Sequence, residues 1–213
     1  MRADSNEAWP RLHLQLTMLS ERAKTLIDKA RIVSFEPWQA DCPAAIVRRF
    51  QEADDRREYL SRADLAAIAE RSSVSPRQTK AANTLRDEAA TIVSGARKNM
   101  LAAYPDITQP GGALYPEMRA EACWRDLWNF LRCISYGVAG DRRDYISAVG
   151  LEYLGQLYEE LHVPLDAMTC GIANLKTCAL PLFDADTQAA IGTYFDYIAE
   201  SMQRLKDLQA RSV

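Results

Sequence analysis

Three side chains that could bind or react with a ligand stand close together in Cys123-Trp-Arg-Asp126. They bring a thiol, a guanidinium and a carboxylate into one turn of a predicted helix, where Cys123 and Asp126 share a face. A carboxylate accepts strong hydrogen bonds, and a planar guanidinium is suited to pairing with another carboxylate. Taken alone, however, a half-buried helix cysteine is usually a small apolar residue, and Arg125 with Asp126 could be a solvated face. The group indicates a ligand site only if the rest of the chain agrees.

No motif of a conventional enzyme accompanies this group. The chain has no GxGxxG, no phosphate-binding P-loop, no GxSxG and no HExxH. Its only histidines are His13 and His162, so it cannot supply the two Glu-x-x-His pairs of a di-iron bundle. We therefore expect no catalytic residue and no metal site, and a protein that is not an enzyme.

The composition is that of an ordinary globular protein. The 213 residues are 48% hydrophobic and 26% charged with a net charge of −3, so no basic field indicates nucleic-acid binding. No apolar run reaches the roughly 18 residues that span a bilayer, and residues 1–16 lack the order of a signal peptide. The five cysteines show no regular spacing, which fits free thiols in a reducing compartment. We expect a cytoplasmic protein without an integral membrane segment.

Almost every periodic stretch of the sequence is typical of helix, and no alternating run of strand length competes. Ser61 followed by Asp64 predicts a capping box at a helix start. The segments Ser73–Pro76 and Tyr104–Gly112 predict breaks, because they are rich in turn-forming residues. The chain is therefore predicted to be all-α. The predicted helices cover residues 7–34, 44–57, 62–72, 78–103, 117–138, 142–161, 164–178 and 184–206, with a linker at 34–43.

Six segments between about Ala44 and Met202 follow one another in an order and spacing that carry a family resemblance. They are Glu52-Ala-Asp-Asp-Arg-Arg-Glu-Tyr-Leu-Ser61; Asp106-Ile-Thr-Gln-Pro-Gly-Gly112 with Tyr115; Ala122-Cys-Trp-Arg-Asp-Leu127 with Leu131-Arg132 and Ser135-Tyr136; Gly137-Val-Ala-Gly-Asp141; Gly150-Leu151 with Tyr158 and Val163-Pro164; and Gly192-Thr-Tyr-Phe-Asp-Tyr197. Each is similar to a motif of the phycobiliprotein family, and the set most resembles allophycocyanin-type subunits. The resemblance covers roughly three quarters of the chain. A lone Cys-x-Arg-Asp would be weak evidence for the family, but six such segments in the same order are strong evidence.

The resemblance implies a globin-like helical bundle preceded by N-terminal helices. It also implies a bound open-chain tetrapyrrole, a bilin of the phycocyanobilin, phycoerythrobilin or biliverdin type. Cys123 matches the cysteine that forms a thioether with the bilin. Asp126 matches the carboxylate that accepts hydrogen bonds from the pyrrole N–H groups, and Arg125 matches the arginine that pairs with a propionate.

The same helix departs from the family pattern at several positions. Asn129 stands where a tyrosine often contacts the bilin. Trp124 and Trp128 replace smaller or charged residues, and their added π surface could stack on a tetrapyrrole. We keep these three residues as candidate bilin contacts. His162 stands where the family has a helix-ending glycine, a position that favours positive φ.

Residues 1–43 have no counterpart in a standard antenna subunit. They are expected to form a helical extension and linker before a globin domain at 44–206 and a tail at 207–213. Their apolar stripe must pack on the same domain, on a second copy or on another protein. That stripe is formed by Trp9, Leu12, Leu16 and Leu19.

The resemblance also implies partners. Antenna subunits contact the N-terminal helical pair of a partner chain, which points to a homo- or hetero-oligomer of related globin chains. The positions matching that contact are Asp54, Arg56, Arg57 and Tyr59.

Two functions remain open from the sequence. The first is a bilin-binding globin, either a divergent light-harvesting subunit of a phycobilisome at the thylakoid surface or a stand-alone bilin protein. The second is a pigment-free globin-fold interaction module that docks through its N-terminal helix. Cys123, Arg125 and Asp126 together favour the ligand, whereas Asn129, and Thr91 in place of a pocket asparagine of the family, favour its loss.

Overall fold

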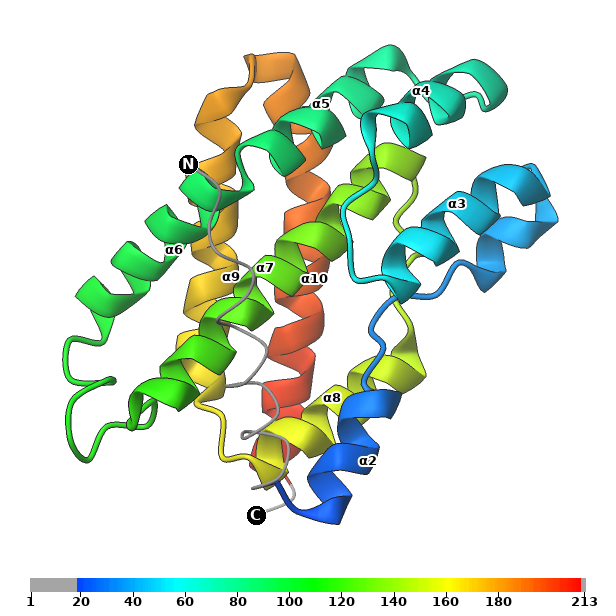
Figure 1. Cartoon of the computed structure of the whole chain (residues 1–213). Helices are drawn as coiled ribbons and strands as arrows, with labels where there is room; N and C mark the ends of the chain where they lie inside the picture. Colours follow the sequence, from blue (N-terminus) through cyan, green and yellow to red (C-terminus); the bar gives the residue numbers. More distant parts are fainter. Residues whose placement is uncertain (1–18, 212–213) are drawn as a thin grey trace, which may run out of the picture.

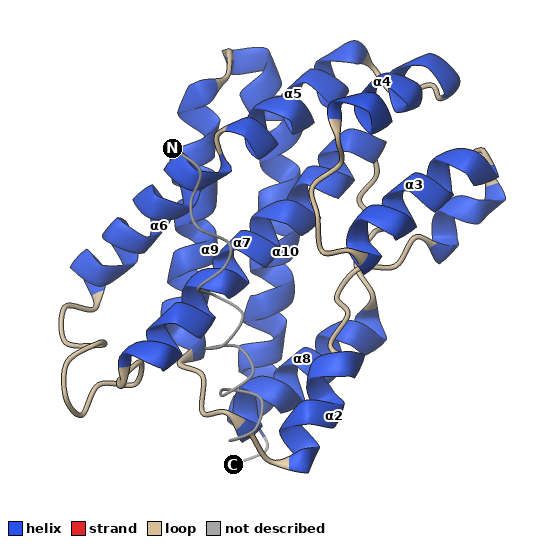
Figure 2. Ribbon diagram, in the orientation of Figure 1, coloured by secondary structure: helices blue, strands red, loops and turns tan. Residues whose placement is uncertain are grey.

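The computed structural model describes residues 19–211 (Figures 1 and 2). The regular elements of this range are helices, and one isolated β-bridge is present besides them. This confirms the all-α prediction. In chain order they are α2 (Glu21–Lys29), η1 (Glu36–Ala40), α3 (Ala44–Asp55), α4 (Arg62–Arg71), α5 (Pro76–Asp87), α6 (Ala89–Ala103), α7 (Glu117–Gly140), α8 (Ala148–Glu160), α9 (Leu165–Ala179), η2 (Leu180–Leu182) and α10 (Ala185–Arg211). The helix predicted to end at 206 thus continues through Arg211.

Helix α7 is the central element, in contact with α4, α5, α6, α9 and α10. From Phe130 to Ala139 every residue on it is buried, including Arg132 and Ser135. A helix that is enclosed on all sides must be covered by several neighbours at once. The residues of the candidate site lie on the preceding turns of this same helix, so the bundle fixes their directions.

Local signals in the sequence set several helix ends. The predicted capping box is confirmed, because the Ser61 hydroxyl accepts from the Asp64 backbone N–H and the Asp64 carboxylate accepts from that of Ser61. Pro76 occupies the first turn of α5, as its missing N–H allows. His162, just after α8, has a φ of 51°, so it adopts the left-handed conformation that glycine adopts most easily.

The predicted helix 78–103 is wrong in one respect, because it is two helices divided at Glu88. No Gly or Pro marks this point in the sequence. The two halves pack on different neighbours, α5 mainly on α7 and α6 mainly on α9, and one straight helix could not do both. At the joint Arg86 donates to the Leu60 carbonyl at 3.0 Å and also contacts Asp87 at 2.8 Å.

Two other predicted boundaries are wrong because of a pairing between distant segments. Helix α2 ends at Lys29 rather than near 34, and α8 begins at Ala148 rather than at 142. The chain around Val33 instead runs antiparallel to that around Ile146. The Ser34 N–H donates to the Tyr145 carbonyl and the Ser147 N–H to the Ile32 carbonyl, both at 2.9 Å. Residues 7–18 of the predicted first helix lie outside the described range.

The segment predicted as a linker carries a core residue. Trp38 of η1 is fully buried, its ring centroid lies 4.8 Å from that of Phe50, and its indole N–H donates to Asp144 at 3.1 Å. A side chain at Gly140 would collide with this ring, because a Cβ there would lie 2.4 Å from it. Together with α2 beside α8 (Figure 1), this shows that the described part of the extension packs on its own domain.

No helix within the described range is long and apolar enough to cross a membrane.

We expect Trp38→Ala to lower the free energy of unfolding by about 3–5 kcal/mol, the usual cost of truncating a buried tryptophan. Gln39→Ala, an exposed neighbour in the same helix, is the control and should change it by less than about 0.5 kcal/mol. Urea denaturation followed by circular dichroism measures both. An unchanged free energy of unfolding in Trp38→Ala would contradict the packing of the extension against the bundle.

Candidate functional site

The thiol of Cys123 faces the interior of the bundle. Its side chain is buried, and its Sγ lies 3.0 Å from the Sδ of Met168 on α9. Burial, and then the charge of Asp126, raises the pKa of this thiol to about 12. The thiol is therefore protonated at neutral pH, and the flexible side chain of Met168 lies against it. No sequence pattern indicates Met168, because the contact joins two helices that are far apart in the chain.

Asp126, one turn further along α7, faces α8. Its Oδ2 accepts a hydrogen bond from the Tyr158 hydroxyl at 2.8 Å, and the side chain is half-buried. Burial raises the pKa of this carboxyl to about 6, although the Tyr158 hydrogen bond and the charge of Arg125 lower it. A carboxylate offers about four acceptor positions, so the bond from Tyr158 leaves capacity for further N–H donors. Tyr158 belongs to a family segment of the sequence, but its link to Asp126 is visible only in the fold.

The other polar candidates line the outer side of the same helix. Arg125 is exposed, Asn129 is half-buried, and Trp128 exposes 39% of its surface. The backbone carbonyl of Trp128 accepts from the Tyr59 hydroxyl at 3.4 Å, which links α7 to the loop before α4. These positions flank Asp126 along the chain, and two of the three are exposed.

Trp124 does not join this group. Its ring is buried under α6, with the Arg97 guanidinium 4.8 Å above its centroid, on a different flank of α7 from Asp126. The candidate site therefore consists of Cys123, Arg125 and Asp126, with Trp128 and Asn129 at its border.

The chemistry of the remaining group fits a bilin. With a bilin bound, Asp126 would offer an acceptor to pyrrole N–H groups, and Arg125 would offer a positive charge to a propionate. Cys123 lies near enough to Asp126 for the carboxylate to raise its pKa, so a ligand at Asp126 would be near the thiol. The thiol is the part that fits least, since Met168 would have to move before Cys123 could react.

Comparison with known proteins settles the family. The family model described as phycobilisome protein matches residues 48–202. The chain belongs to this family. Its members are non-enzymatic light-harvesting proteins and are typically oligomeric, so the expectation that the chain is not an enzyme agrees with its family. The globin-like fold implied by the resemblance is confirmed as well.

Several relatives of this phycobilisome-family chain are allophycocyanin subunits. It is 31% identical over 160 residues to the allophycocyanin alpha chain of Thermosynechococcus vestitus, covering 75% of this chain and 99% of the relative. It is 33% identical to the allophycocyanin alpha chain of Galdieria sulphuraria, covering 74% and 98%. It is also 33% identical to the allophycocyanin subunit alpha-B of a Nostoc species, covering 71% and 94%. The extension accounts for most of the uncovered residues.

One residue of the implied partner contact is engaged inside the chain. Asp54 is 4% exposed and binds Arg132 of α7 at 2.9 Å and Arg31 of the extension at 2.5 Å. Losing one member of a buried ion pair is costly, so this carboxylate is not available for a partner without a rearrangement. Arg56 and Arg57 are exposed and Tyr59 is half-buried.

The raised pKa of Asp126 predicts how the stability of the fold depends on pH. The pKa of Asp126 is about 6 in the folded chain and near 4 when unfolded, so the folded state favours the protonated carboxyl. Its favourable contribution to the free energy of unfolding is therefore fully present below about pH 4 and is lost as the pH rises through 6. Asp126→Asn cannot ionise and still offers Tyr158 an acceptor. We expect it to raise the free energy of unfolding by about 1–2 kcal/mol at pH 7.5 and by nothing measurable at pH 4.

Glu121→Gln, an exposed carboxylate of the same helix, is the matched control and should be neutral at both pH values. Urea titrations at pH 4 and pH 7.5 give the comparison. A gain that is equal at both pH values would show that ionisation of Asp126 is not its source.

Proposed function

We propose that this phycobilisome-family chain binds a bilin against α7, with Asp126 as the central hydrogen-bond acceptor. The observation that carries the proposal is the half-buried carboxylate, which the folded chain keeps at a pKa of about 6 beside a cysteine and an arginine. An ionisable group held at a cost in stability is typical of a binding or catalytic site. N–H donors from a ligand would offset that cost, because they favour the charged carboxylate.

The other residues have separate tasks in this proposal. The bilin supplies the absorption of visible light. Arg125, exposed on the same helix, pairs with a propionate, while Trp128 and Asn129 border the ligand. Tyr158 fixes the direction of the Asp126 carboxylate by donating to one of its oxygens.

Covalent attachment is a second part of the proposal, and Cys123 is the residue that would hold the bilin as a thioether. The position of Cys123 in the family motif supports this. Met168 stands in front of the thiol at 3.0 Å, but methionine has an unbranched, flexible side chain that can repack at low cost. The high pKa of the thiol implies that attachment at neutral pH is slow unless another protein assists it.

One observation supports each of the two roles in which the chain could bind a bilin. Similarity to allophycocyanin alpha chains over nearly their whole length supports a divergent light-harvesting subunit, associated with a thylakoid surface. The engagement of Asp54 by Arg31 of the extension supports a stand-alone bilin protein in the cytoplasm. The alternative function, a pigment-free interaction module, is favoured by one observation, the covered thiol of Cys123.

Production of the full chain in cells that make biliverdin and phycocyanobilin, and that also contain a bilin lyase, tests the proposal. We expect a coloured protein, and a zinc-dependent fluorescent band on a denaturing gel that Cys123→Ala abolishes. Cys133→Ala, another buried cysteine of α7, should keep the band. If the native protein is coloured but its pigment is released on the denaturing gel in every variant, the thioether is refuted while bilin binding is not. A colourless protein with both bilins would refute bilin binding and leave the interaction module.

Asp126→Ala should reduce the long-wavelength absorption and the fluorescence of the pigmented protein several-fold while much of the pigment stays bound, because the pyrrole N–H groups lose their acceptor. Glu121→Ala is the control on the same helix and should leave the spectrum unchanged. Absorption and emission spectra at equal bilin content make the comparison. An unchanged spectrum for Asp126→Ala would remove Asp126 from the site.

A further inference from the structure

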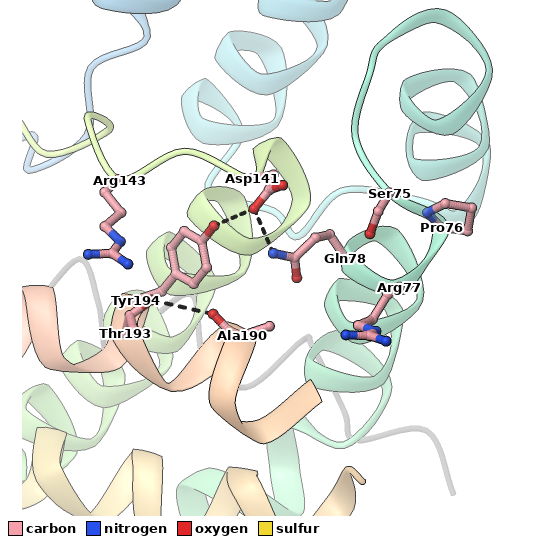
Figure 3. A pocket seen from close by; sticks show the side chains of 9 residues that line it. All are labelled: Ser75, Pro76, Arg77, Gln78, Asp141, Arg143, Ala190, Thr193 and Tyr194. Atoms are coloured by element: carbon pink, nitrogen blue, oxygen red, sulfur yellow. Dashed lines mark hydrogen bonds between the residues drawn. The ribbon is translucent and has the colours of Figure 1, made fainter. Parts of the chain in front are cut away.

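The two ends of α7 differ in how they are covered. At the far end, Gln78 of α5 and Tyr194 of α10 donate to Asp141 at 2.7 and 2.8 Å, and Figure 3 shows both side chains directed toward this carboxylate. On the first half of the helix, one side is exposed to solvent. The exposed residues recur at steps of three and four and therefore share that side: Met118, Glu121, Arg125 and Trp128.

Apolar surface is concentrated on this exposed side of α7. Met118 is 40% exposed, Trp128 is 39% exposed, and Tyr115, just before the helix, is 48% exposed. They are three of the five large apolar side chains that are exposed in the described part of the chain. The flanks next to them are covered, since Trp124 meets α6 and Asp126 meets α8. Exposed apolar residues that gather in one place indicate a contact surface.

The described part of the chain begins close to the start of this surface. The Ser20 hydroxyl donates to Glu160 at the end of α8 at 2.7 Å, and Arg119 of α7 donates to the carbonyls of the next two residues after Glu160 at 2.9 Å. Ser20 is also the N-cap of α2, so the residues before it do not continue the axis of that helix. Residues 1–18 therefore join the bundle beside the first turn of α7, where Met118 is exposed.

The segment before Ser20 carries an apolar stripe of matching length. Its members recur at steps of three and four: Trp9, Leu12, Leu16 and Leu19. Leu19, the last of them, packs against the core of the bundle. In a helix, Trp9 lies about 10 Å from Leu16, which is also the distance along α7 from Met118 to Arg125.

We propose that residues 7–18 dock as a helix on the exposed side of α7 and run antiparallel to it. Leu16 contacts Met118 near the point where the segment joins the bundle, and Trp9 lies toward Trp128. The segment belongs to the same chain, so its effective concentration at this surface is high and no second molecule is needed. The apolar stripe of the segment and the exposed apolar side chains of α7 are then buried against each other.

The docked segment lies over the border of the candidate bilin site. It covers Arg125 and Trp128, whereas Cys123 faces α9 and Asp126 faces α8. Docking needs no bilin, so the pigment-free chain tests it separately from the proposed function.

Fluorine NMR of the pigment-free full chain labelled with 5-fluorotryptophan tests the docking, because each of the four tryptophans gives its own resonance. The shift of a resonance between H₂O and D₂O reports how far that ring is exposed to solvent. We expect this solvent shift for Trp128 to be at least twofold larger in Leu12→Asp than in the wild type. Leu14→Asp, the same change on the opposite side of the segment, is the control and should leave it unchanged. The fully buried Trp38 should not respond in any variant.

Two variants of the bundle test the surface itself. Met118→Asp should raise the solvent shift of Trp128 as Leu12→Asp does, whereas Val149→Asp, an exposed apolar residue of α8, should not. A solvent shift of Trp128 that is equal in the wild type and in Leu12→Asp would overturn the proposal. Protection of Trp128 that disappears on dilution would overturn it as well, because the surface would then be covered by a second copy of the chain.

Discussion

The burial of α7 is the constraint on which the rest of the structure depends. Its second half is enclosed on every side, so its neighbours must approach from several directions, and α5 and α6 separate at Glu88 to do so. The directions of the residues on its first half follow from the same arrangement. Cys123 meets α9, Trp124 meets α6 and Asp126 meets α8. One helix thereby supplies the thiol and the carboxylate of the candidate site and holds both in fixed positions.

The extension is part of this packing rather than an appendage. Trp38 fills a place beside Phe50 that only a glycine at 140 leaves open, and Arg31 reaches the buried carboxylate of Asp54. Removing either contact would leave a cavity or an uncompensated buried charge. The extension therefore engages Asp54, a carboxylate for which the sequence resemblance implies a partner contact.

The candidate bilin site holds a polar group that the folded chain alone does not satisfy, the Asp126 carboxylate with its raised pKa. A ligand with N–H donors can offset this cost, which weighs against stability at neutral pH.

The sequence by itself determined the helical class and the capping box at Ser61, because these depend on periodicity and on residues close in the chain. The family resemblance added that His162 stands where a glycine is usual, and the structure shows His162 in the left-handed conformation. Family motifs also brought out Cys123, Arg125 and Asp126. Only the tertiary structure decided the break at Glu88, the pairing of residues 32–34 with 145–147 and the burial of Trp38, since each depends on segments that meet from far apart. For the same reason, no local pattern in the sequence indicates three contacts of α7: Met168 with the thiol, Tyr158 with the carboxylate, and Trp124 with α6.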